Sequence, residues 1–450
     1  MADRESRSEF QTSEIVDQRL RPCARSRWLS LYFLVRLSMS QTTADSESRA
    51  GSADLEEPAL APRLDTSLLM MMAVACGVFV ANVYYNQPIL ELLHQAFPQA
   101  TSLVNLAPTA TQLGFACGLF FLIPLGDRID RRKLILGQAA ALIVALVCLA
   151  AAPNAWMLVI ASAVVGISAS VAQQIVPFAA ELAAPSRRGQ VVGIVMSGVL
   201  CGLLLGRAVG GFTGDHWGWR ATFWLGALMT AIAWLMLLAK LPHSKPQANH
   251  SYFGLMKSLI VLWREEPLLR RATCIQAALF GSFIGLWTIL ALHLHEAFGL
   301  GADVAGLMGV VGAVGILIAP LAGRVADHRG PRVVIGVGCL IMLLSYPVLG
   351  LWGSLVGLIV GIILLDLGEQ LALISNQHVV YALRPEARSR LNTLFMSGMF
   401  LGGAAGSWGA SVSWRLGGWH TACLFGGLLV LLAFVLHFTG RLAAYANAKS

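Results

Sequence analysis

Two acidic residues stand inside one long apolar stretch, residues 354–380, where a charged side chain is costly. Asp366 lies near the middle of this stretch, and Glu369 and Gln370 follow three and four positions later, so that all three share one face of a helix. Ionising a carboxyl group in apolar surroundings costs free energy, and such a group is therefore suited to carrying a proton. The alternative is a structural ion pair, with Arg207 as the partner.

Arg207 is itself unusual, because it falls within the apolar stretch 190–212. A charged residue within a membrane span usually faces a cavity or a partner. The same stretch carries small residues close to a four-residue spacing, namely Gly202, Gly206, Gly210 and the adjoining Gly211. Small residues at this spacing let two helix backbones approach closely. We expect a functional role for Arg207, as a proton-coupling candidate beside Asp366 and Glu369, and helix packing for the glycines.

A third polar group lies in the motif NVYYNQP, residues 82–88. Asn82, Tyr85 and Asn86 have the spacing that places them on one helical face. Pro88 can break or kink a helix at this point.

The sequence offers little support for metal, cofactor or nucleotide chemistry. His293 and His295 are two positions apart, which points them to nearly opposite sides of a helix, so we reject a zinc site with Glu296. The eight cysteines show no CxxC spacing, and no Gly-x-x-x-x-Gly-Lys-Ser/Thr pattern is present. We expect no metal, no cofactor and no ATP-driven pump on this chain. An integral-membrane enzyme would need a tight catalytic cluster, and none stands out.

Composition indicates the solvent that surrounds these residues. Of the 450 residues, 56% are hydrophobic and only 12% are charged, far fewer than the roughly 25% typical of soluble domains. The net charge of +8 does not indicate nucleic-acid binding, because Lys and Arg occur in short clusters between apolar stretches. The expected partner is the lipid bilayer.

About twelve stretches are long and apolar enough to span a membrane as helices. They cover residues 68–91, 105–125, 133–152, 155–181, 190–212, 219–240, 271–294, 303–323, 332–351, 354–380, 390–412 and 418–439. The chain also repeats itself at an offset of 200 residues, which aligns Pro185 with Pro385 and Gly218-Trp219 with Gly418-Trp419. The predicted fold is all-α and integral to the membrane, with two pseudo-symmetric six-helix bundles. Parallel repeats of this kind occur in secondary transporters.

The boundaries follow from these stretches. We predict six-helix halves at 67–241 and 271–440, a central cytoplasmic loop at 242–270 and a cytoplasmic tail at 441–450. A short amphipathic stretch at 252–263 is expected on the membrane surface. Every second connection is rich in Arg and Lys, which places both termini in the cytoplasm by the positive-inside rule. Residues 1–66 are expected to be a disordered cytoplasmic tail, with translation starting at Met39 as an alternative.

Two charged turns carry a resemblance to a known family. After the second and eighth stretches the chain resembles the major facilitator superfamily pattern Gly-x-Leu-Ala-Asp-Arg-x-Gly-Arg-Arg. The first copy matches at Leu125, Asp127, Arg128, Arg131 and Arg132 and departs at Ile123 and Asp130. The second copy matches at Gly323, Ala326, Asp327, Gly330 and Arg332. An aspartate here can pair with Arg side chains and a helix N-terminus, so we expect a gating latch; the alternative is that the Arg clusters only fix topology.

The resemblance also implies a site and a function. Helices 1, 4, 7 and 10 line the central cavity in this family, and the implied substrate-cavity candidates are Asn82, Tyr85, Asn86, Gln173, Gln174, Gln276, Trp287 and Gln370. The glycines of residues 202–211 are similar to the efflux-branch pattern Gly-x-x-x-Gly-Pro-x-x-Gly-Gly, with Arg207 at the Pro position. The implied protein is a monomeric, bacterial-type inner-membrane transporter that exports a small organic molecule with a proton as the coupling ion.

Three alternatives to this function stay open at the level of sequence: a proton-coupled uptake permease or facilitator, a transport-inactive sensor, and an integral-membrane enzyme. The irregular composition of residues 1–66 gives the sensor hypothesis little support, because such proteins usually carry a folded soluble extension.

Overall fold

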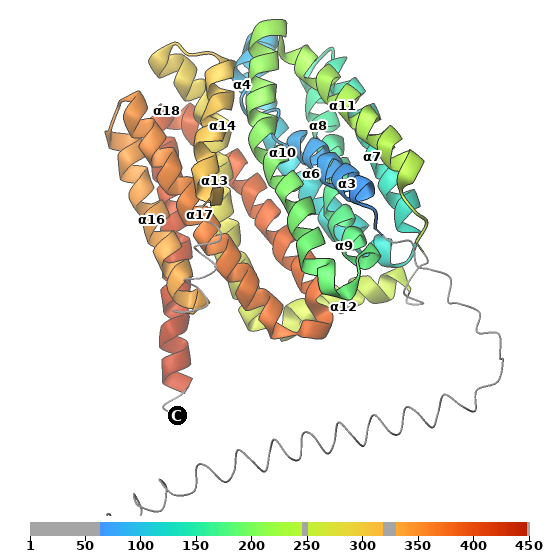
Figure 1. The fold of residues 1–450 in the computed structure, drawn as a ribbon. Helices are drawn as coiled ribbons and strands as arrows, with labels where there is room; N and C mark the ends of the chain where they lie inside the picture. Colours follow the sequence, from blue (N-terminus) through green and yellow to red (C-terminus); the bar gives the residue numbers. More distant parts are fainter. Residues whose placement is uncertain (1–63, 245–250, 318–329, 448–450) are drawn as a thin grey trace, which may run out of the picture. The chain divides into compact units, whose positions relative to one another are not determined.

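The computed structural model describes residues 64–244, 251–317 and 330–447, apart from the side chains of residues 127, 313–317, 385 and 440–447. Every regular element in these ranges is a helix, and most of the helices run roughly parallel through the molecule (Figure 1). The all-α membrane class is confirmed. Predicted residues Gly323 and Asp327, and nearly all of the expected tail at 1–66, lie outside the described ranges.

The first repeat contains nine α-helices. These are α3 (Thr66–Ala81), α4 (Leu90–Ala96), α5 (Thr101–Val104), α6 (Leu106–Leu122), α7 (Arg131–Ala150), α8 (Ala155–Ala169), α9 (Ala172–Leu182), α10 (Arg188–Trp217) and α11 (Trp219–Lys240). Short 3-10 turns at Pro98–Ala100, Pro124–Asp127 and Pro185–Arg187 precede α5, follow α6 and precede α10.

The second repeat follows α12 (Tyr252–Glu265), a helix within the predicted central loop. It contains α13 (Pro267–Phe298), α14 (Ala302–Leu317), α16 (Pro331–Leu351), α17 (Leu355–Leu383), a 3-10 turn at Pro385–Ala387 and α18 (Arg388–Asn447). Gly417 and Gly418 interrupt α18 with non-helical backbone, so α18 joins the last two predicted spans and continues past residue 440.

The helix lengths fit a membrane protein. Nine helical segments in the described ranges are long and apolar enough to cross a bilayer, and α3 and Ala302–Gly312 are shorter apolar helices. One of the nine is Arg388–Thr439, which contains the break at Gly417 and Gly418. The count of twelve spans stays a prediction.

The 200-residue repeat is visible in how glycines pack helices together. Gly202 on α10 lies against the backbone of Gly77 on α3, where even a methyl group would overlap the carbonyl of Gly77. The equivalent Gly402 on α18 lies in the same way against Ala277 on α13. Because backbones touch at these points, the first helix of each repeat is held against the fifth.

Two equivalent helices also begin with capping residues that are 200 positions apart. Asn154 caps α8 by accepting a hydrogen bond from the Met157 N–H, and Ser354 caps α17 by accepting one from the Gly357 N–H. Such caps satisfy N–H groups that the first turn of a helix leaves without partners. The two repeats are therefore built on equivalent local signals as well as on equivalent packing.

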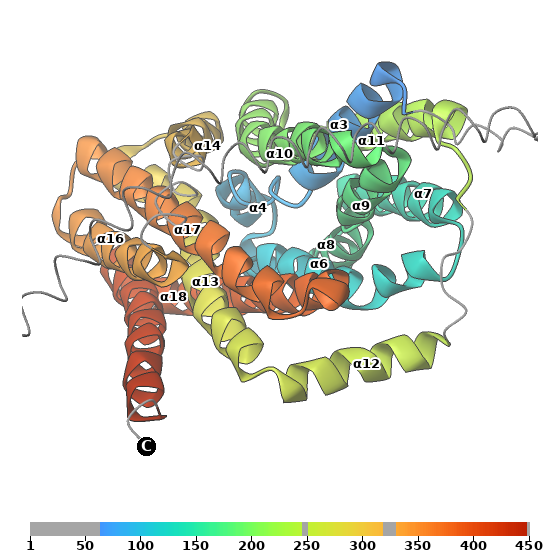
Figure 2. The same cartoon turned by 60° about the horizontal axis from the view of Figure 1, so that its bottom comes forward.

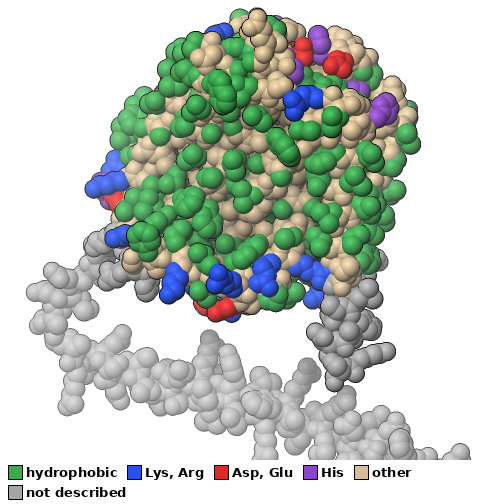
Figure 3. Space-filling view, turned by 180° about the vertical axis from the view of Figure 1, so that it is seen from behind, with side chains coloured by type: hydrophobic (Ala, Val, Ile, Leu, Met, Phe, Trp, Pro, Cys, Tyr) green, Lys and Arg blue, Asp and Glu red, His purple; other side chains and the backbone are tan. Residues whose placement is uncertain are grey.

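Charged side chains divide the molecule into two ends. Lys and Arg gather at the lower end of the view in Figure 3, below a broad apolar surface, and His and acidic side chains gather mainly at the opposite end. We call the first the basic end and the second the far end. The connections α6–α7, α9–α10 and α17–α18 lie at the basic end, and Figure 2 brings this end forward with α12 running across it.

Three predicted boundaries differ from the structure. The first span is not continuous over 68–91, because α3 ends at Ala81 and tight turns lead to α4. The fourth span, 155–181, is divided into α8 and α9. The seventh helix begins at Pro267, ahead of residue 271, since proline favours the first turn of a helix.

Candidate functional site

Arg207 lies on α10 between the two repeats with 1% of its surface exposed. Its Nε donates a hydrogen bond of 2.9 Å to Oε1 of Gln87, whereas its Nη2 has no partner in the described residues. The guanidinium carbon is 4.2 Å from the ring centre of Trp287 and 4.6 Å from that of Tyr84. The ring of Phe283 is 5.8 Å away. Aromatic faces attract a cation, so these rings replace part of the hydration that Arg207 loses on burial.

The break in the first helix brings Tyr84 and Gln87 to Arg207. From Asn82 to Ile89 the chain forms turns, in which the N–H of Tyr84 bonds to Ala81 O and that of Gln87 to Tyr84 O. The break starts ahead of Pro88, which cannot donate a backbone hydrogen bond to support a helix through this point. Backbone turns at membrane depth are tolerated where protein buries them, and all eight residues here are buried.

Helix α14 separates Arg207 from the acidic pair. A methyl group on Gly309 would lie 3.0 Å from Cβ of Arg207, and one on Gly312 would lie 2.8 Å from Oδ1 of Asp366. The two glycines are one turn apart, so Arg207 and Asp366 both pack against the glycine backbone of the same helix. Within the described residues the two do not form an ion pair, and Oδ2 of Asp366 has no hydrogen-bond partner. The structural ion pair considered from the sequence is therefore not formed in this conformation.

Glu369 forms the centre of a polar chain between α13 and α17. Its Oε1 accepts a hydrogen bond of 2.6 Å from Nε2 of Gln276, and Oε1 of Gln276 accepts one of 3.0 Å from Asn376. The Oε2 atom of Glu369 has no partner in the described part of the chain, and the residue is 2% exposed. The structure thus joins three residues of the predicted site, Asp366, Glu369 and Gln276, in one buried region of the second repeat.

Other predicted cavity residues bond within the first repeat. Asn82 donates to Thr230 on α11, and Asn86 donates to Thr111 on α6 and more weakly to Ser162 on α8. Gln174 donates to Gln138 on α7 and to Leu122 O. The remaining candidates are Tyr85, packed against Gly210 and Gly226, and the half-buried Gln173 and Gln370. Their role toward a substrate stays a prediction.

Three residues that contact Arg207 were not selected by the prediction from helical spacing. Tyr84 and Gln87 lie in the same NVYYNQP motif as the selected residues, but a continuous helix would turn them away from Asn82 and Asn86. Phe283 is one turn from Trp287 on α13, a signal that the sequence did contain.

The glycines Gly206, Gly210 and Gly211 lie against Ala81, Tyr85 and Ala302, respectively.

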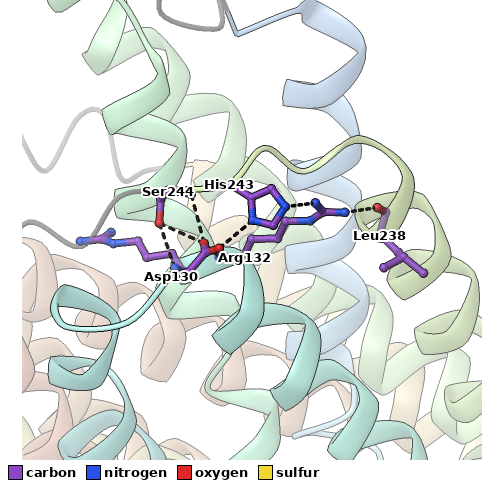
Figure 4. Close-up of polar contacts among 6 residues, drawn as sticks. Asp130, Arg132, Leu238, His243 and Ser244 are labelled. Carbon is purple, nitrogen blue, oxygen red and sulfur yellow. Dashed lines mark hydrogen bonds and ion pairs between the residues drawn. The ribbon is translucent and has the colours of Figure 1, made fainter.

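The charged turn after α6 differs from its counterpart in the second repeat. Gly330 has φ 84°, a backbone that favours glycine, whereas Asp130 has φ −55° and caps α7 by accepting from the Arg132 N–H. Asp130 also accepts bonds from His243 and Ser244, which follow α11 (Figure 4). Burial by itself would raise the pKa of Asp130, but the bonds from His243, Ser244 and Arg132 outweigh it and lower the pKa.

The remaining gating candidates are distributed around the basic end. Arg131 pairs with Glu181 at 2.9 Å, and Arg132 bonds to His243 and to Leu238 O. Arg128 and Arg332 are exposed. The side chain of Asp127 lies outside the description, so its gating role stays a prediction.

Three hydrogen bonds join the two repeats toward the far end. Asp215 at the end of α10 accepts a 3.0 Å hydrogen bond from the N–H of Ala302, the first residue of α14. Thr109 bonds to Ser407, and Arg415 bonds to Ser102. A cavity of about 210 Å³ lies beside Asp215, and Glu91 and His295 line it. His293 instead stacks on Trp419, and no group of metal-binding side chains occurs in the described ranges.

Comparison with known proteins identifies the family. The Major Facilitator Superfamily profile matches residues 68–377 and 272–449. The chain belongs to the Major Facilitator Superfamily. The "Uncharacterized transporter YgaY" of Escherichia coli O157:H7 is 37% identical over 84% of this chain and 96% of its own length. SCO4007 of Streptomyces coelicolor, also named a transporter, is 32% identical over 81% of this chain and 86% of its own.

A solved structure gives the same fold. A D-xylose-proton symporter has a TM-score of 0.66 with 18% identity, over 83% of this chain and 97% of that one. The family match and the relatives named as transporters identify the chain as a multi-pass membrane transporter and not an enzyme. Its substrate is a small molecule.

Proposed function

We propose that the protein exports a small organic molecule across the bacterial inner membrane in exchange for protons, by alternating access. The observation that carries proton coupling is the pair Asp366 and Glu369. Both are less than 10% exposed inside a membrane helix, and each has a carboxyl oxygen without a partner among the described residues. An uncompensated charge at this depth is costly. We therefore expect these carboxyl groups to bind a proton in one conformation and to release it in another.

The polar chain through Gln276 supports a conformational consequence of protonation. Ionised Glu369 accepts a strong, charge-assisted hydrogen bond from Gln276, whereas the protonated form also carries a donor and bonds more weakly as an acceptor. Because Gln276 is on α13 and Glu369 is on α17, a proton on Glu369 loosens the contact between these helices. This links the proton to helix movement.

Alternating access is supported by the hydrogen bonds at the two ends, which differ in the elements that they join. The bonds Asp215–Ala302, Thr109–Ser407 and Arg415–Ser102 join the repeats at the far end. At the basic end α12 bonds to both repeats, through Tyr252 to Phe121 O and through Arg384 to Glu265. With the basic end in the cytoplasm, we infer a conformation that is closed to the outside. Both termini are then cytoplasmic.

Export is the proposed direction because the glycines of α10 are similar to the pattern of efflux members. Gly202 and Gly206 hold α10 against α3, and Gly211 holds it against α14, so α10 packs closely against both repeats. A helix that contacts both repeats through bare backbone is able to slide when they rock.

The test is transport by the full-length protein in proteoliposomes that enclose a pH-sensitive dye. A panel of organic acids, amines and sugars is added under an imposed pH gradient, and proton flux is recorded with compound movement. We expect Asp366→Asn and Glu369→Gln each to abolish gradient-driven movement, while the control Asp303→Asn at the start of α14 retains it. Unchanged proton-driven transport in both variants would refute the coupling. Movement that ignores the gradient in the wild type would indicate a facilitator.

A further inference from the structure

We propose that the exported molecule carries an acidic group, and that three buried donors around Arg207 bind it. This inference rests on the proposed transport function and names the chemical class of its substrate. The donors are Nη2 of Arg207, Nε2 of Gln87 and Nε1 of Trp287, and each lacks a hydrogen-bond partner in the described residues. All three side chains are at most 2% exposed.

The three donors belong to side chains that contact one another at Arg207. Gln87 uses its amide oxygen to accept from Nε of Arg207 at 2.9 Å, which leaves its amide nitrogen beside the same guanidinium. The Trp287 ring centre is 4.2 Å from the guanidinium carbon, so the indole N–H is also close. A buried donor without a partner destabilises the fold, and three such donors in side chains that meet at one guanidinium are not explained by packing alone. An acceptor with several lone pairs would satisfy them together.

The charge balance favours an anion over a neutral acceptor. Arg207 stays charged, and its one hydrogen-bond partner among the described side chains is the neutral amide of Gln87. The rings of Tyr84, Phe283 and Trp287 offset part of the charge but supply no hydrogen bonds to Nη2. Gly309 presents only backbone to Arg207 from α14. Asp366 interacts with Arg207 electrostatically but forms no ion pair with it. A carboxylate or similar oxyanion would provide both a direct counter-charge and the missing acceptors.

The aromatic side chains around Arg207 also indicate what the rest of the substrate is like. The three aromatic rings form an apolar wall beside the guanidinium, and Phe283 stands 6.2 Å from Trp287, ring centre to ring centre. Flat apolar groups pack well against such rings. The fitting class is a small organic acid with a planar or apolar body.

Binding to the purified full-length protein tests this class without any proton gradient. The probes are benzoate and indole-3-acetate, each with its neutral amide, and benzylammonium as the cation of similar shape. We expect both acids to raise the melting temperature of the wild type, and the amides and the amine to leave it unchanged. Arg207→Gln should weaken acid binding at least about tenfold, because a charge-assisted hydrogen bond is lost.

Three further variants separate recognition from folding. Gln87→Glu keeps the shape of the side chain but supplies an internal counter-charge to Arg207, so acid binding should be lost in a folded protein. Trp287→Phe keeps a ring and removes the indole N–H, and should weaken binding by a smaller factor. Arg220→Gln is the matched control, because Arg220 also stacks on a tryptophan, at 4.1 Å, but bonds to Ala152 O. It should bind acids as the wild type does.

The outcomes are distinct from those of the transport assay. The proposal is overturned if the amides stabilise the wild type as much as the acids do, if neither acid shifts the melting temperature, or if acid binding survives in both Arg207→Gln and Gln87→Glu. Acid binding that depends on Arg207, together with proton-independent movement, would leave this inference standing and remove proton coupling. Proton-driven transport of neutral or cationic compounds only would do the reverse.

Discussion

The contact between α3 and α10 makes a prediction in which two glycines of one helix respond with opposite signs. Gly202 lies against the backbone of Gly77. Gly193 is nearer to the start of α10, and no neighbouring atom lies within 4 Å of the place where its methyl group would stand. Both residues are inside the helix Arg188–Trp217. Replacing either glycine with alanine therefore has the same effect on helix propensity, but the effect on packing differs between the two positions.

The magnitudes follow from these surroundings. Gly202→Ala forces a methyl group into a backbone carbonyl that cannot rotate away, which should destabilise the protein by about 1–3 kcal/mol. Gly193→Ala meets no obstacle and gains helix propensity, which should stabilise by up to about 1 kcal/mol. The two variants should differ by roughly 1–4 kcal/mol although they carry the same substitution in the same helix.

Thermal unfolding of the purified variants at one detergent and lipid concentration measures this difference. The order of melting temperatures should be Gly193→Ala, wild type, Gly202→Ala. Gly402→Ala should behave as Gly202→Ala does, because Gly402 lies against Ala277 at the equivalent place in the second repeat. If Gly202→Ala melts at or above the wild type, or if Gly193→Ala loses as much as Gly202→Ala, the close helix contact does not hold the repeat together.

Two further predictions concern the ends of the molecule. Asp215→Ala removes the cap on α14, which is worth about 1 kcal/mol, and should shift the equilibrium between the closed and open far end about fivefold toward the open state. Distances between spin labels at Gln95 and Glu296 measure this shift. His216→Ala is the control. A far-end distance distribution unchanged by Asp215→Ala would count against the cap. The lowered pKa of Asp130 means that its bonds stabilise the fold above its ordinary value of 3.8, and that this contribution is lost as pH falls through the lowered value. Asp130→Ala should therefore melt lower than the wild type at pH 7, and the two melting curves should converge in strong acid; a constant gap between them would contradict this.

Much of the scaffold could be predicted because it depends on local sequence. Apolar stretches of the right length predict membrane helices, since backbone groups in lipid must bond within their own segment. The 200-residue offset predicts equivalent helix starts, and Asn154 and Ser354 do cap equivalent helices. The pairing of Asp366 with Glu369 on one face also follows from spacing alone, because both are on the continuous helix α17.

The Arg207 site could not be predicted in the same way. Spacing selected Asn82, Tyr85 and Asn86 on the assumption of a continuous first helix, and the helix ends at Ala81. Whether that helix breaks depends on the neighbours that bury its turns and bond to them, and Gln87 is bound by Arg207, which is 120 residues away in the chain.

The sequence by itself determined that this protein is a membrane bundle of two repeats with buried charges, because solvation and helix periodicity act on each segment separately. Only the tertiary structure decided which side chains meet those charges. The turns between α3 and α4, together with α13 and α14, supply the groups that contact Arg207. Asp366 stays apart from Arg207, and bare glycine backbone on α14 lies against both residues. Such an arrangement depends on packing between segments far apart in the chain, and no pattern within one segment encodes it.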